Sequence, residues 1–461
     1  MKQLAKKSVL VLGLGETGLS LVRWVTAQGA RVRVADSRNN PPSLDMLRKE
    51  FPIADIHCGF FRSELLDEIE LIAISPGVPL RDPFVVKAIA QGIPVVGDIE
   101  LFALALPQKN CPKIIAITGS NGKTTVTSMV GAMCRAAGKD TVVAGNISPA
   151  VLDVLMQRGG KHPDVWVLEL SSFQLETTHS LNADAATVLN ISEDHMDRYN
   201  DMGEYIAAKA RIFRASGKGG VQVLNRDDAD SAAMTLLERR HITFGLNTPP
   251  PGDEDWGIEE ENLDTWLVQG KRRVLKANEL VVEGLHNISN ALAALALCRA
   301  IELPLPPLLD ALRNFKGLPH RVEAVAEIRD VIYYDDSKGT NVGATVAALK
   351  GLGRRAVVIL GGDGKGQDFT PLVPAVTQHA RAVVLIGRDA DKIAAILHGC
   401  DVPVFYAGDM TEAVKLSATE ALPGDAVLMS PACASFDMFR NYVHRAEAFI
   451  SAVQAMQKGG A

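Results

Sequence analysis

The residues with the clearest chemical content are 118–125, which read Thr-Gly-Ser-Asn-Gly-Lys-Thr-Thr. They follow an apolar run at 113–117 and precede an apolar, proline-free segment at 126–137 that we expect to be helical. Glycines let backbone N–H groups approach phosphate oxygens, and the start of a helix adds the positive end of its dipole. The sequence therefore predicts a phosphate-binding loop between a strand and a helix.

In such a loop Lys123 reaches the β- and γ-phosphates of ATP, and the hydroxyl of Thr124 binds Mg²⁺. The usual pattern has a glycine five residues before the Gly-Lys pair, where this chain has Ile117. We interpret the loop as a shortened variant; the competing interpretation is a plain turn with a surface lysine. The residues expected to bind ATP here are Gly119, Ser120, Asn121, Gly122, Lys123, Thr124 and Thr125.

A second glycine turn, at residues 13–18, follows the apolar run 9–12, and Asp36 ends the next predicted strand. This is the dinucleotide-binding pattern, in which glycines and a helix start hold a diphosphate and an acid binds a ribose hydroxyl. By itself it suggests an NAD-dependent oxidoreductase, but a UDP-sugar offers the same diphosphate. The turn around Gly77 follows a third strand and is a further candidate contact.

Two acidic segments follow strands near the phosphate loop. Glu169 comes directly after the run 165–168, where a carboxylate beside bound phosphate is a natural Mg²⁺ ligand. His195 lies between Asp194 and Asp197, which makes it a candidate for a metal or phosphate contact. The alternatives are an ordinary loop acid and a structural histidine.

Downstream polar residues lie on predicted helices. Asn287 and Asn290 are three residues apart and so share a helix face. Capping accounts for one of them, and a contact with a purine or phosphate accounts for the second. On the residues alone, Lys209 and Arg211 read as solvated charges.

The last third of the chain has three glycine- or hydroxyl-rich loops after strands, at 333–341, 361–366 and 428–442. Lys338 and Lys365, with nearby hydroxyl and N–H groups, could clamp an anionic substrate with two carboxylates. The alternative is a set of glycine-rich loops with surface lysines.

Short apolar runs alternate with helix-like segments along all 461 residues, which predicts an α/β protein with parallel sheets and about three domains. The runs are 9–12, 32–35, 71–75, 114–118, 165–168, 187–189, 221–224, 357–360, 383–386 and 426–429. Polar, proline-containing stretches place the domains at 1–107, 108–317 and 318–461. The Pro-rich, acidic segment 247–262 is predicted to be a solvated loop.

Composition excludes several other classes. A net charge of −6 argues against nucleic-acid binding, and no apolar run reaches the roughly 18 residues that a membrane span needs. The basic N-terminus leads into an apolar run that ends at Gly13, so we interpret it as a first strand rather than a signal peptide. Six scattered cysteines favour reduced thiols in a cytoplasm.

These clusters, in this order, resemble the Mur ligases from about residue 9 to 450. The shortened loop 118–125 is typical of that superfamily, which also includes folylpolyglutamate synthetase. The segments Asp335-Asp-Ser-Lys-Gly-Thr-Asn341 and Ser430-Pro-Ala-Cys-Ala-Ser435 look like those of the members that add D-glutamate. The resemblance implies a Rossmann-like UDP-binding domain, a central P-loop ATPase-like domain with a mainly parallel sheet, and a Rossmann-like C-terminal domain.

The resemblance also implies a role for individual residues. The UDP-substrate would contact Gly13, Leu14, Gly15, Glu16, Thr17, Gly18, Asp36, Ser37, Arg38, Gly77, Asn146 and His195. The nucleotide would further contact Asn287, Asn290, Arg321, Asp336 and Asp363. Two Mg²⁺ ions would be held by Thr124, Glu169, His195 and a carbamylated Lys209. D-Glutamate would be held by Lys338, Thr340, Lys365, Ser435, Phe436 and Tyr442, the last through its backbone N–H.

The implied reaction is ATP-dependent formation of an amide bond between UDP-N-acetylmuramoyl-L-alanine and D-glutamate through an acyl phosphate. Lys123, His195 and Lys209 would be catalytic. The setting would be peptidoglycan precursor synthesis in a bacterial cytoplasm, by a monomer. An NAD-dependent oxidoreductase would explain only the first domain, and a folylpolyglutamate-type ligase should lack a UDP-binding domain. A non-catalytic nucleotide-binding regulator would leave the loops of the third domain unexplained.

Overall fold

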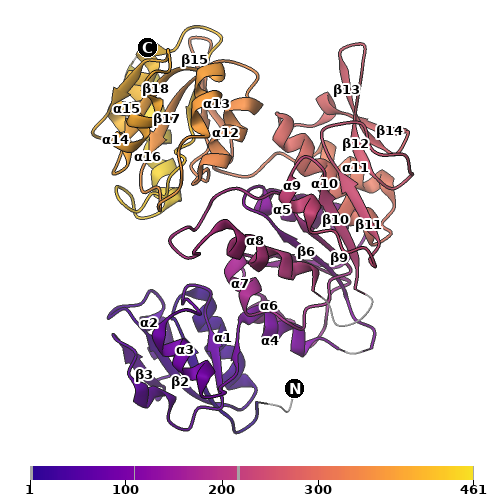
Figure 1. Cartoon of the computed structure of the whole chain (residues 1–461), viewed down its shortest axis with the longest axis vertical. Helices are drawn as coiled ribbons and strands as arrows, with labels where there is room; N and C mark the ends of the chain where they lie inside the picture. The colour runs from indigo at the N-terminus through magenta and orange to yellow at the C-terminus, as the bar shows by residue number, and fades with distance from the viewer. Residues whose placement is uncertain (1–3, 108, 215–218, 460–461) are drawn as a thin grey trace.

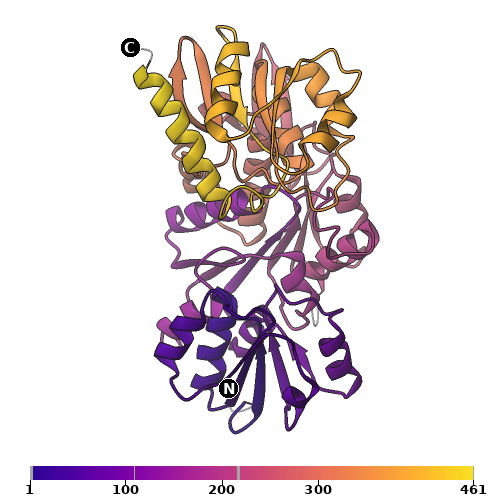
Figure 2. The same ribbon diagram turned by 90° about the vertical axis from the view of Figure 1, so that its left-hand side faces the viewer.

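The computed structural model describes residues 4–107, 109–214 and 219–459. It has three units in sequence, each built around its own sheet, with the N-terminal unit at one end of the molecule and the C-terminal unit at the other (Figures 1 and 2). The predicted α/β fold with three such domains is confirmed. The predicted ends at 1, 108 and 461 lie outside the described residues, and the domain boundaries stay predictions.

The N-terminal unit has a five-stranded parallel sheet with the order β3-β2-β1-β4-β5. Its strands are β1 (Ser8–Leu12), β2 (Arg31–Asp36), β3 (Asp55–Cys58), β4 (Leu71–Ile74) and β5 (Val95–Val96). Its helices are α1 (Glu16–Ala27), α2 (Leu44–Glu50), η1 (Ser63–Leu66), α3 (Pro83–Ala90) and α4 (Asp98–Ala105). The chain order reverses direction at β1, so the carboxyl ends of β1 and β4 border the crevice in which such sheets bind ligands.

The central unit has a six-stranded parallel sheet with the order β11-β10-β9-β6-β8-β7. Its strands are β6 (Lys113–Thr118), β7 (Thr141–Gly145), β8 (Val165–Glu169), β9 (Ala185–Val188), β10 (Val221–Asn225) and β11 (His241–Phe244). Its helices are α5 (Lys123–Ala136), α6 (Val151–Gln157), α7 (Ser172–Glu176), α8 (Met202–Ala210), η2 (Arg211–Phe213), α9 (Ala229–Ala233), α10 (Leu285–Ala300) and α11 (Leu305–Arg313). Because β6 lies between β9 and β8, the loops after these three strands meet at one edge.

A small antiparallel sheet projects from the central unit (Figure 1). It consists of β12 (Trp256–Glu261), β13 (Asp264–Gln269) and β14 (Arg272–Lys276), followed by η3 (Ala277–Glu279). The prediction of a loop over 247–262 is therefore wrong for the residues of β12. Trp256 and Ile258 are buried, and the acidic residues that made the segment look solvated reach Arg273 on β14, as in the 2.7 Å pair with Glu259.

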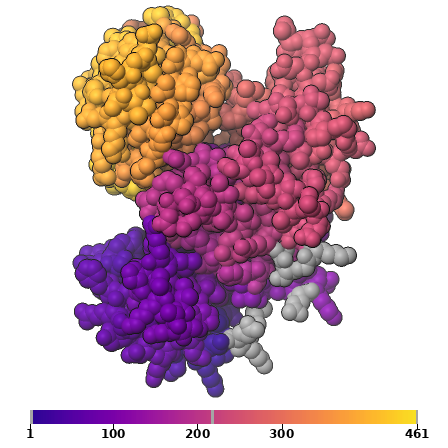
Figure 3. Space-filling model, in the orientation of Figure 1, coloured from indigo at the N-terminus to yellow at the C-terminus, as the bar shows by residue number. Residues whose placement is uncertain are grey.

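The C-terminal unit has a mixed sheet with the order β15-β16-β20-β17-β18-β19, in which only β15 is antiparallel to its neighbour. Its strands are β15 (Glu323–Ile328), β16 (Val331–Asp335), β17 (Ala356–Gly361), β18 (Ala380–Ile386), β19 (Val404–Tyr406) and β20 (Ala426–Met429). Its helices are α12 (Val342–Gly351), α13 (Leu372–His379), α14 (Ala390–Leu397), α15 (Met410–Glu420) and α16 (Tyr442–Gly459). This unit rests on the central one, and a hollow separates it from the β12–β14 projection (Figure 3).

All ten predicted strands are present, with bounds that differ by a few residues. The short or partly exposed strands, such as β3 and β5, were not predicted because their apolar runs are too brief to stand out. Within the described residues, no helix combines the length and apolar character needed to cross a membrane. All six cysteines are free thiols.

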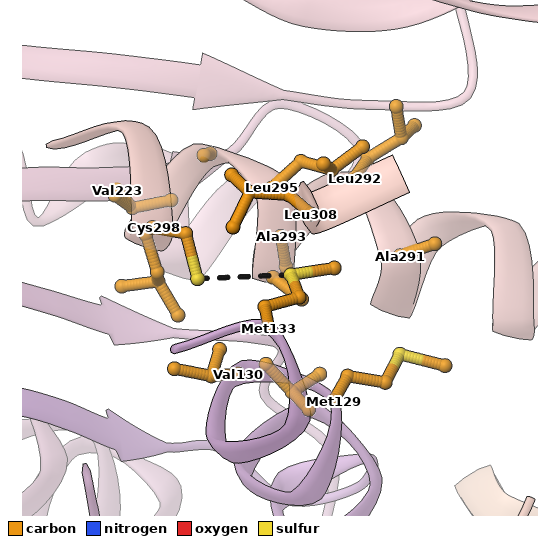
Figure 4. Close-up of a cluster of buried hydrophobic side chains, with 14 of the residues drawn as sticks. Met129, Val130, Met133, Val223, Ala291, Leu292, Ala293, Leu295, Cys298 and Leu308 are labelled. Atoms are coloured by element: carbon orange, nitrogen blue, oxygen red, sulfur yellow. Dashed lines mark hydrogen bonds between the residues drawn. The ribbon is translucent and has the colours of Figure 1, made fainter. Parts of the chain in front are cut away.

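The helix that follows the phosphate loop is fixed by a buried apolar cluster. Met129 and Met133 of α5 pack against Leu292, Leu295 and Cys298 of α10, with Sγ of Cys298 3.6 Å from Sδ of Met133 (Figure 4). All of these side chains are at most 1% exposed. Because α5 begins at Lys123, this packing also fixes where the loop and its lysine lie.

Replacing Leu295 with alanine should therefore destabilise the central unit. Deleting a fully buried leucine side chain costs about 2–5 kcal/mol. We expect the L295A variant to unfold several degrees below the wild type when thermal unfolding is followed by circular dichroism. The control is L237A, since Leu237 is 96% exposed and its truncation should leave the unfolding temperature unchanged.

Candidate active site

The backbone of the phosphate loop surrounds the amine of Lys123. Gly122 has a positive φ of 81°, and a Cβ at this position would lie 2.7 Å from Oδ1 of Asn290. Nζ of Lys123 donates to the carbonyl oxygens of Gly119 at 2.7 Å and Ser120 at 2.9 Å. Backbone N–H groups, a buried lysine and a helix start are thus collected at the carboxyl end of β6, which is suited to binding a polyphosphate.

The loop of residues 190–199, here the junction loop, lies directly against the phosphate loop. The N–H of Asn121 donates to Oδ1 of Asn190 at 2.8 Å. Oγ of Ser120 donates to the carbonyl oxygen of Ser192 at 3.0 Å and lies 3.0 Å from the hydroxyl of Tyr205 on α8. These bonds bring the segment that contains His195 to the same edge of the sheet as Lys123.

Glu169 has a carboxylate oxygen that is ready for a cation. Its Oε1 accepts from Nδ2 of Asn146 at 2.8 Å, whereas Oε2 is buried and meets no donor within the part of the chain that the structure describes. A buried carboxylate oxygen without a donor is costly unless a cation occupies it. Mg²⁺ prefers oxygen ligands and phosphate, so this free carboxylate oxygen fits the role predicted for Glu169, whereas metal binding by Thr124 and His195 stays a prediction.

Lys209 is buried beside the phosphate loop, not solvated as its residue type alone had suggested. Its Nζ donates to the carbonyl oxygen of Gly119 at 2.9 Å and lies 4.6 Å from the centre of the Tyr205 ring. Burial lowers the pKa of this lysine well below its usual value, and the nearby charge of Lys123 lowers it further. An uncharged amine is therefore accessible here. Arg211, by contrast, contacts His179 near the surface.

His195 and Asp194 form a polarised pair in the junction loop. Burial lowers the pKa of His195 to about 4, so its imidazole is neutral at pH 7 and has a free lone pair. Burial alone would raise the pKa of Asp194, but His195 and Lys365 hold it at about 2. Nζ of Lys365 lies 2.9 Å from Oδ1 of Asp194, so an ion pair joins the C-terminal unit to the central one.

A second set of charges comes from the C-terminal unit. Nζ of Lys338 lies 4.2 Å from the centre of the Tyr442 ring. Much of this side chain is exposed, but the loss of water around its amine and the nearby charge of Arg321 lower its pKa to about 8. Burial raises the pKa of Asp336 to about 7, although Oγ of Ser430 donates to this carboxylate at 2.7 Å. Arg321 is buried within electrostatic reach of both Asp336 and Glu169, so it lies between the two units.

The remaining predicted residues are placed as follows. Nδ2 of Asn290 lies 3.4 Å from Oδ1 of Asn287, whose own Nδ2 donates to the Glu283 carbonyl oxygen. Thr340 is half-buried, Ser435 is buried, and Phe436 is exposed. The carbonyl oxygen of Tyr442 accepts from Ser337. Asp363 pairs with Arg388 at 3.0 Å, on its own unit rather than toward the phosphate loop.

A cleft of about 200 Å³ lies between the N-terminal and central units. It is lined by Gly15, Glu16, Thr17, Ser75, Pro76, Gly77, Gly145, Asn146, Ile147, Ser148, Ala150 and Gln174. The cleft thus gathers the first glycine turn, the Gly77 turn and Asn146. Oγ of Ser148 donates to the carboxylate of Glu16 at 2.8 Å and ties its two walls together.

At the far end of the glycine turn, the carboxylate of Asp36 is held by protein groups. It accepts from the N–H of Leu14 at 2.6 Å and from the guanidinium of Arg38. These bonds fix the turn in which Gly18 approaches Gly13 so closely that a Cβ would lie 1.9 Å from the Gly13 carbonyl oxygen. Ser37 is exposed beside them. Contact of Asp36 with a ribose stays a prediction.

Several residues that form hydrogen bonds between the central and C-terminal units were not predicted from the sequence. Nδ2 of Asn341 donates to Oδ1 of Asn121 at 3.0 Å, and the N–H of Asp368 donates to Glu193. Asn341 also caps α12 and so looked like an ordinary helix start. Asp194 was visible as an acid next to His195, but its partner Lys365 is 171 residues away.

Three family models match consecutive parts of the chain. They are described as the Mur ligase MurD-like N-terminal domain at 7–97, the Mur ligase middle domain at 117–298 and the Mur ligase glutamate ligase domain at 320–433. The chain belongs to the Mur ligase family. The matches cover all three sheet-containing units, which sets aside an oxidoreductase built on the first unit alone.

Curated relatives match over nearly their full length. The UDP-N-acetylmuramoylalanine–D-glutamate ligase of Nitrosospira multiformis is 59% identical over 98% of this chain and 96% of the relative. The protein of the same name from Nitrosomonas eutropha is 57% identical over 98% and 97%.

Solved structures support the fold of this Mur ligase. The UDP-N-acetylmuramate-alanine ligase MurC of Thermotoga maritima superposes with a TM-score of 0.60 at 20% identity, covering 97% of this chain and 99% of that one. The MurF ligase of the same organism, solved with ADP, gives 0.62 at 16% identity and covers 100% and 97%.

The Lys365–Asp194 pair should favour the arrangement seen here, in which the C-terminal unit contacts the central one; we call this arrangement of the Mur ligase closed. A hydrogen bond to a charged group contributes about 1.5–3 kcal/mol, so its loss should shift the equilibrium toward an open form about tenfold or more. We expect K365M to raise the radius of gyration measured by small-angle X-ray scattering. The control is R388M, because Arg388 pairs with Asp363 within the C-terminal unit. Equal radii for K365M and wild type would contradict the role of this pair.

Proposed function

We propose that this Mur ligase joins D-glutamate to UDP-N-acetylmuramoyl-L-alanine and converts ATP to ADP and phosphate. The observation that carries the proposal is the convergence of three groups of residues where the central and C-terminal units meet. These groups are the phosphate loop with Lys123, the carboxylate of Glu169, and the cations Lys338 and Lys365. The curated relatives named as D-glutamate ligases support the choice of amino acid.

ATP would bind along the phosphate loop, with its triphosphate at the start of α5. Lys123, now bonded to loop carbonyl oxygens, would turn to the phosphates, and backbone N–H groups of the loop would hold the oxygens. Asn290 beside Gly122, Asn287 on the same helix, and Arg321 with Asp336 would surround the rest of the nucleotide. Thr125, the third residue of α5, would add a further hydroxyl.

Two Mg²⁺ ions would be held by Thr124, Glu169, His195 and Lys209, and they would offset the charge of the transferring phosphoryl group. A lysine can serve as a ligand only after its amine becomes an oxygen donor, and carbamylation does this by adding CO₂ to the neutral amine. Burial of Lys209 favours that neutral form.

The cleft between the first two units would hold the UDP-substrate. Its diphosphate would meet the N–H groups of the turn 13–18 at the start of α1, and the Gly77 turn would cover it. Asn146 lines this cleft and also contacts Glu169, so the muramyl-alanine end would point from the cleft toward the phosphate loop.

The carboxylate of the terminal alanine would then attack the γ-phosphate and form an acyl phosphate, while Lys123 and the loop N–H groups bind the charge that develops. The amine of D-glutamate would attack the acyl carbon, and the tetrahedral intermediate would expel phosphate. A base must take a proton from the ammonium group. His195 is our candidate because it is unprotonated at neutral pH.

D-Glutamate would be clamped by the C-terminal unit. Lys338 and Lys365 would face its carboxylates, and Thr340, Ser435, Phe436 and the N–H of Tyr442 would complete the pocket. Because Lys365 contacts Asp194 in the junction loop, a clamp at this lysine would face the phosphate loop. We further propose that the enzyme acts as a monomer in the bacterial cytoplasm, in peptidoglycan precursor synthesis.

Phosphate release tests the proposal directly. The purified protein should release phosphate from ATP with UDP-N-acetylmuramoyl-L-alanine and D-glutamate, and not with L-glutamate or without an amino acid. Release that ignores the amino acid would refute the assignment of D-glutamate. Release with a folate substrate instead would assign the chain to the folylpolyglutamate type.

Replacing Lys123 with alanine should abolish this release. The lysine contributes to binding the phosphoryl group in the transition state, so we expect kcat to fall by about 10³-fold or more. Binding of the UDP-substrate, measured by isothermal titration calorimetry, should persist because its cleft is separate. Lys113 provides the control: it is an exposed lysine at the other end of β6, and K113A should retain wild-type turnover.

Binding of D-glutamate should weaken at alkaline pH. The pKa of Lys338 is lowered to about 8, so the lysine is charged below pH 8 and loses its charge as the pH rises above it. The KM for D-glutamate should therefore rise several-fold from pH 7.5 to 9.5. K338M should have a high KM at every pH and lack this part of the rise. A pH dependence identical in both proteins would exclude Lys338 as its source.

A further inference from the structure

Arg198 of the junction loop lies between the N-terminal and central units. Its guanidinium donates to the carbonyl oxygens of Pro76 at 3.1 Å and Val78 at 3.3 Å, and it pairs with Glu176 on α7 at 3.1 Å. The side chain is only 10% exposed. One arginine thus binds two backbone oxygens of one unit and a carboxylate of the other.

The two carbonyl oxygens belong to the turn that covers the cleft. Pro76 and Gly77 line the cleft, and Val78 ends the turn. A second arginine, Arg81, reaches in the opposite direction and donates to the carbonyl oxygen of Asp197 in the junction loop. The position of this wall of the cleft therefore depends on the junction loop.

The guanidinium of Arg198 also contacts an aromatic ring that lies beside His195. It stacks over the ring of Phe173 on α7, with Cζ 4.3 Å from the ring centre. The same ring lies 4.7 Å from the imidazole of His195, measured between ring centres. Arg198, Phe173 and His195 are thus in consecutive contact from the wall of the cleft to the histidine, with the Phe173 and His195 rings tilted by 59° to one another.

We propose that Arg198 is a positioning residue that couples the seating of the UDP-substrate at the Gly77 turn to the placement of His195, with Phe173 as the connecting ring. The inference rests on the proposed function and adds two residues to it. A planar guanidinium is required because it donates to several acceptors in fixed directions while its face stacks on an aromatic ring. A lysine keeps the positive charge that pairs with Glu176. It lacks the several N–H donors that a guanidinium holds in fixed directions, and it lacks the planar face that stacks on a ring.

The contact of Arg198 with the Gly77 turn and the contact of Phe173 with His195 predict different kinetic effects. R198K loses bonds to both carbonyl oxygens and the stacking, so the KM for UDP-N-acetylmuramoyl-L-alanine should rise about tenfold and kcat should fall about tenfold. F173L leaves those bonds in place but removes the ring beside His195, so kcat should fall while this KM stays within twofold of wild type. The KM for ATP should be unchanged in both variants.

The experiment measures kcat and all three KM values for wild type, R198K, F173L and R299M, with thermal unfolding as a check of folding. Arg299 is the matched control, since its guanidinium also donates to a backbone carbonyl oxygen, that of Leu303, but away from both sites. The rise in the UDP-substrate KM of R198K supports the inference, because a loss of folded protein alone would lower kcat without changing any KM. The fall in kcat of F173L counts as support only if its thermal unfolding matches that of wild type. If R198K is poorly folded, F173L still tests the link to His195.

Two outcomes overturn the inference: wild-type constants for R198K, or an F173L variant whose kcat equals that of wild type. Failure of the proposed function looks different. In that case the wild-type protein itself releases no phosphate with the UDP-substrate and D-glutamate, whatever the variants do.

Discussion

Repulsion among clustered cations is the constraint around which this active site is built. Lys123, Lys209, Arg321, Lys338 and Lys365 converge where the central and C-terminal units meet. Fewer carboxylates oppose them, chiefly Glu169 and Asp194, and burial with mutual repulsion lowers the pKa of Lys123, Lys209 and Lys338. Such a site is incomplete without anions, and the triphosphate and dicarboxylate of the proposed reaction would supply them.

The junction loop shows how three separately folded units share one reaction centre. Its first residues bond to the phosphate loop, Glu193 and Asp194 contact the C-terminal unit, and Arg198 binds the N-terminal unit. Each unit contributes residues from the carboxyl ends of its own strands, so each sheet positions its part rigidly. The C-terminal unit meets the central one through polar contacts such as Lys365 with Asp194, whereas the N-terminal and central units share an apolar core in which Phe102 packs on Trp166. Motion of the C-terminal unit therefore breaks polar contacts and leaves that shared core intact.

The local parts of this arrangement could be predicted from the sequence, and the connections between them could not. The glycine spacing at 13–18 and at 119–122, each after an apolar run, predicts a turn and a helix start because backbone geometry alone requires them. Lys209 looks solvated in the sequence because it is buried against the phosphate loop, where its Nζ donates to the carbonyl oxygen of Gly119, 90 residues away. The contacts of Arg198 and Phe173 could not be predicted from the sequence. Every residue has a backbone carbonyl oxygen, so the residue types at the partner positions do not reveal that an arginine binds there. Strand β12 was missed because its charged residues hide a buried Trp256.

The ion pair between Lys365 and Asp194 also bears on how ionic strength acts on this protein. A ligand carboxylate that binds Lys365 does not create a salt bridge where none existed; it replaces one carboxylate with another. The number of close opposite-charge contacts at that lysine is then the same before and after binding. Screening by salt weakens this one pair before and after binding alike, so the salt dependence of capturing an acidic ligand would come from the other cations of the site and not from Lys365.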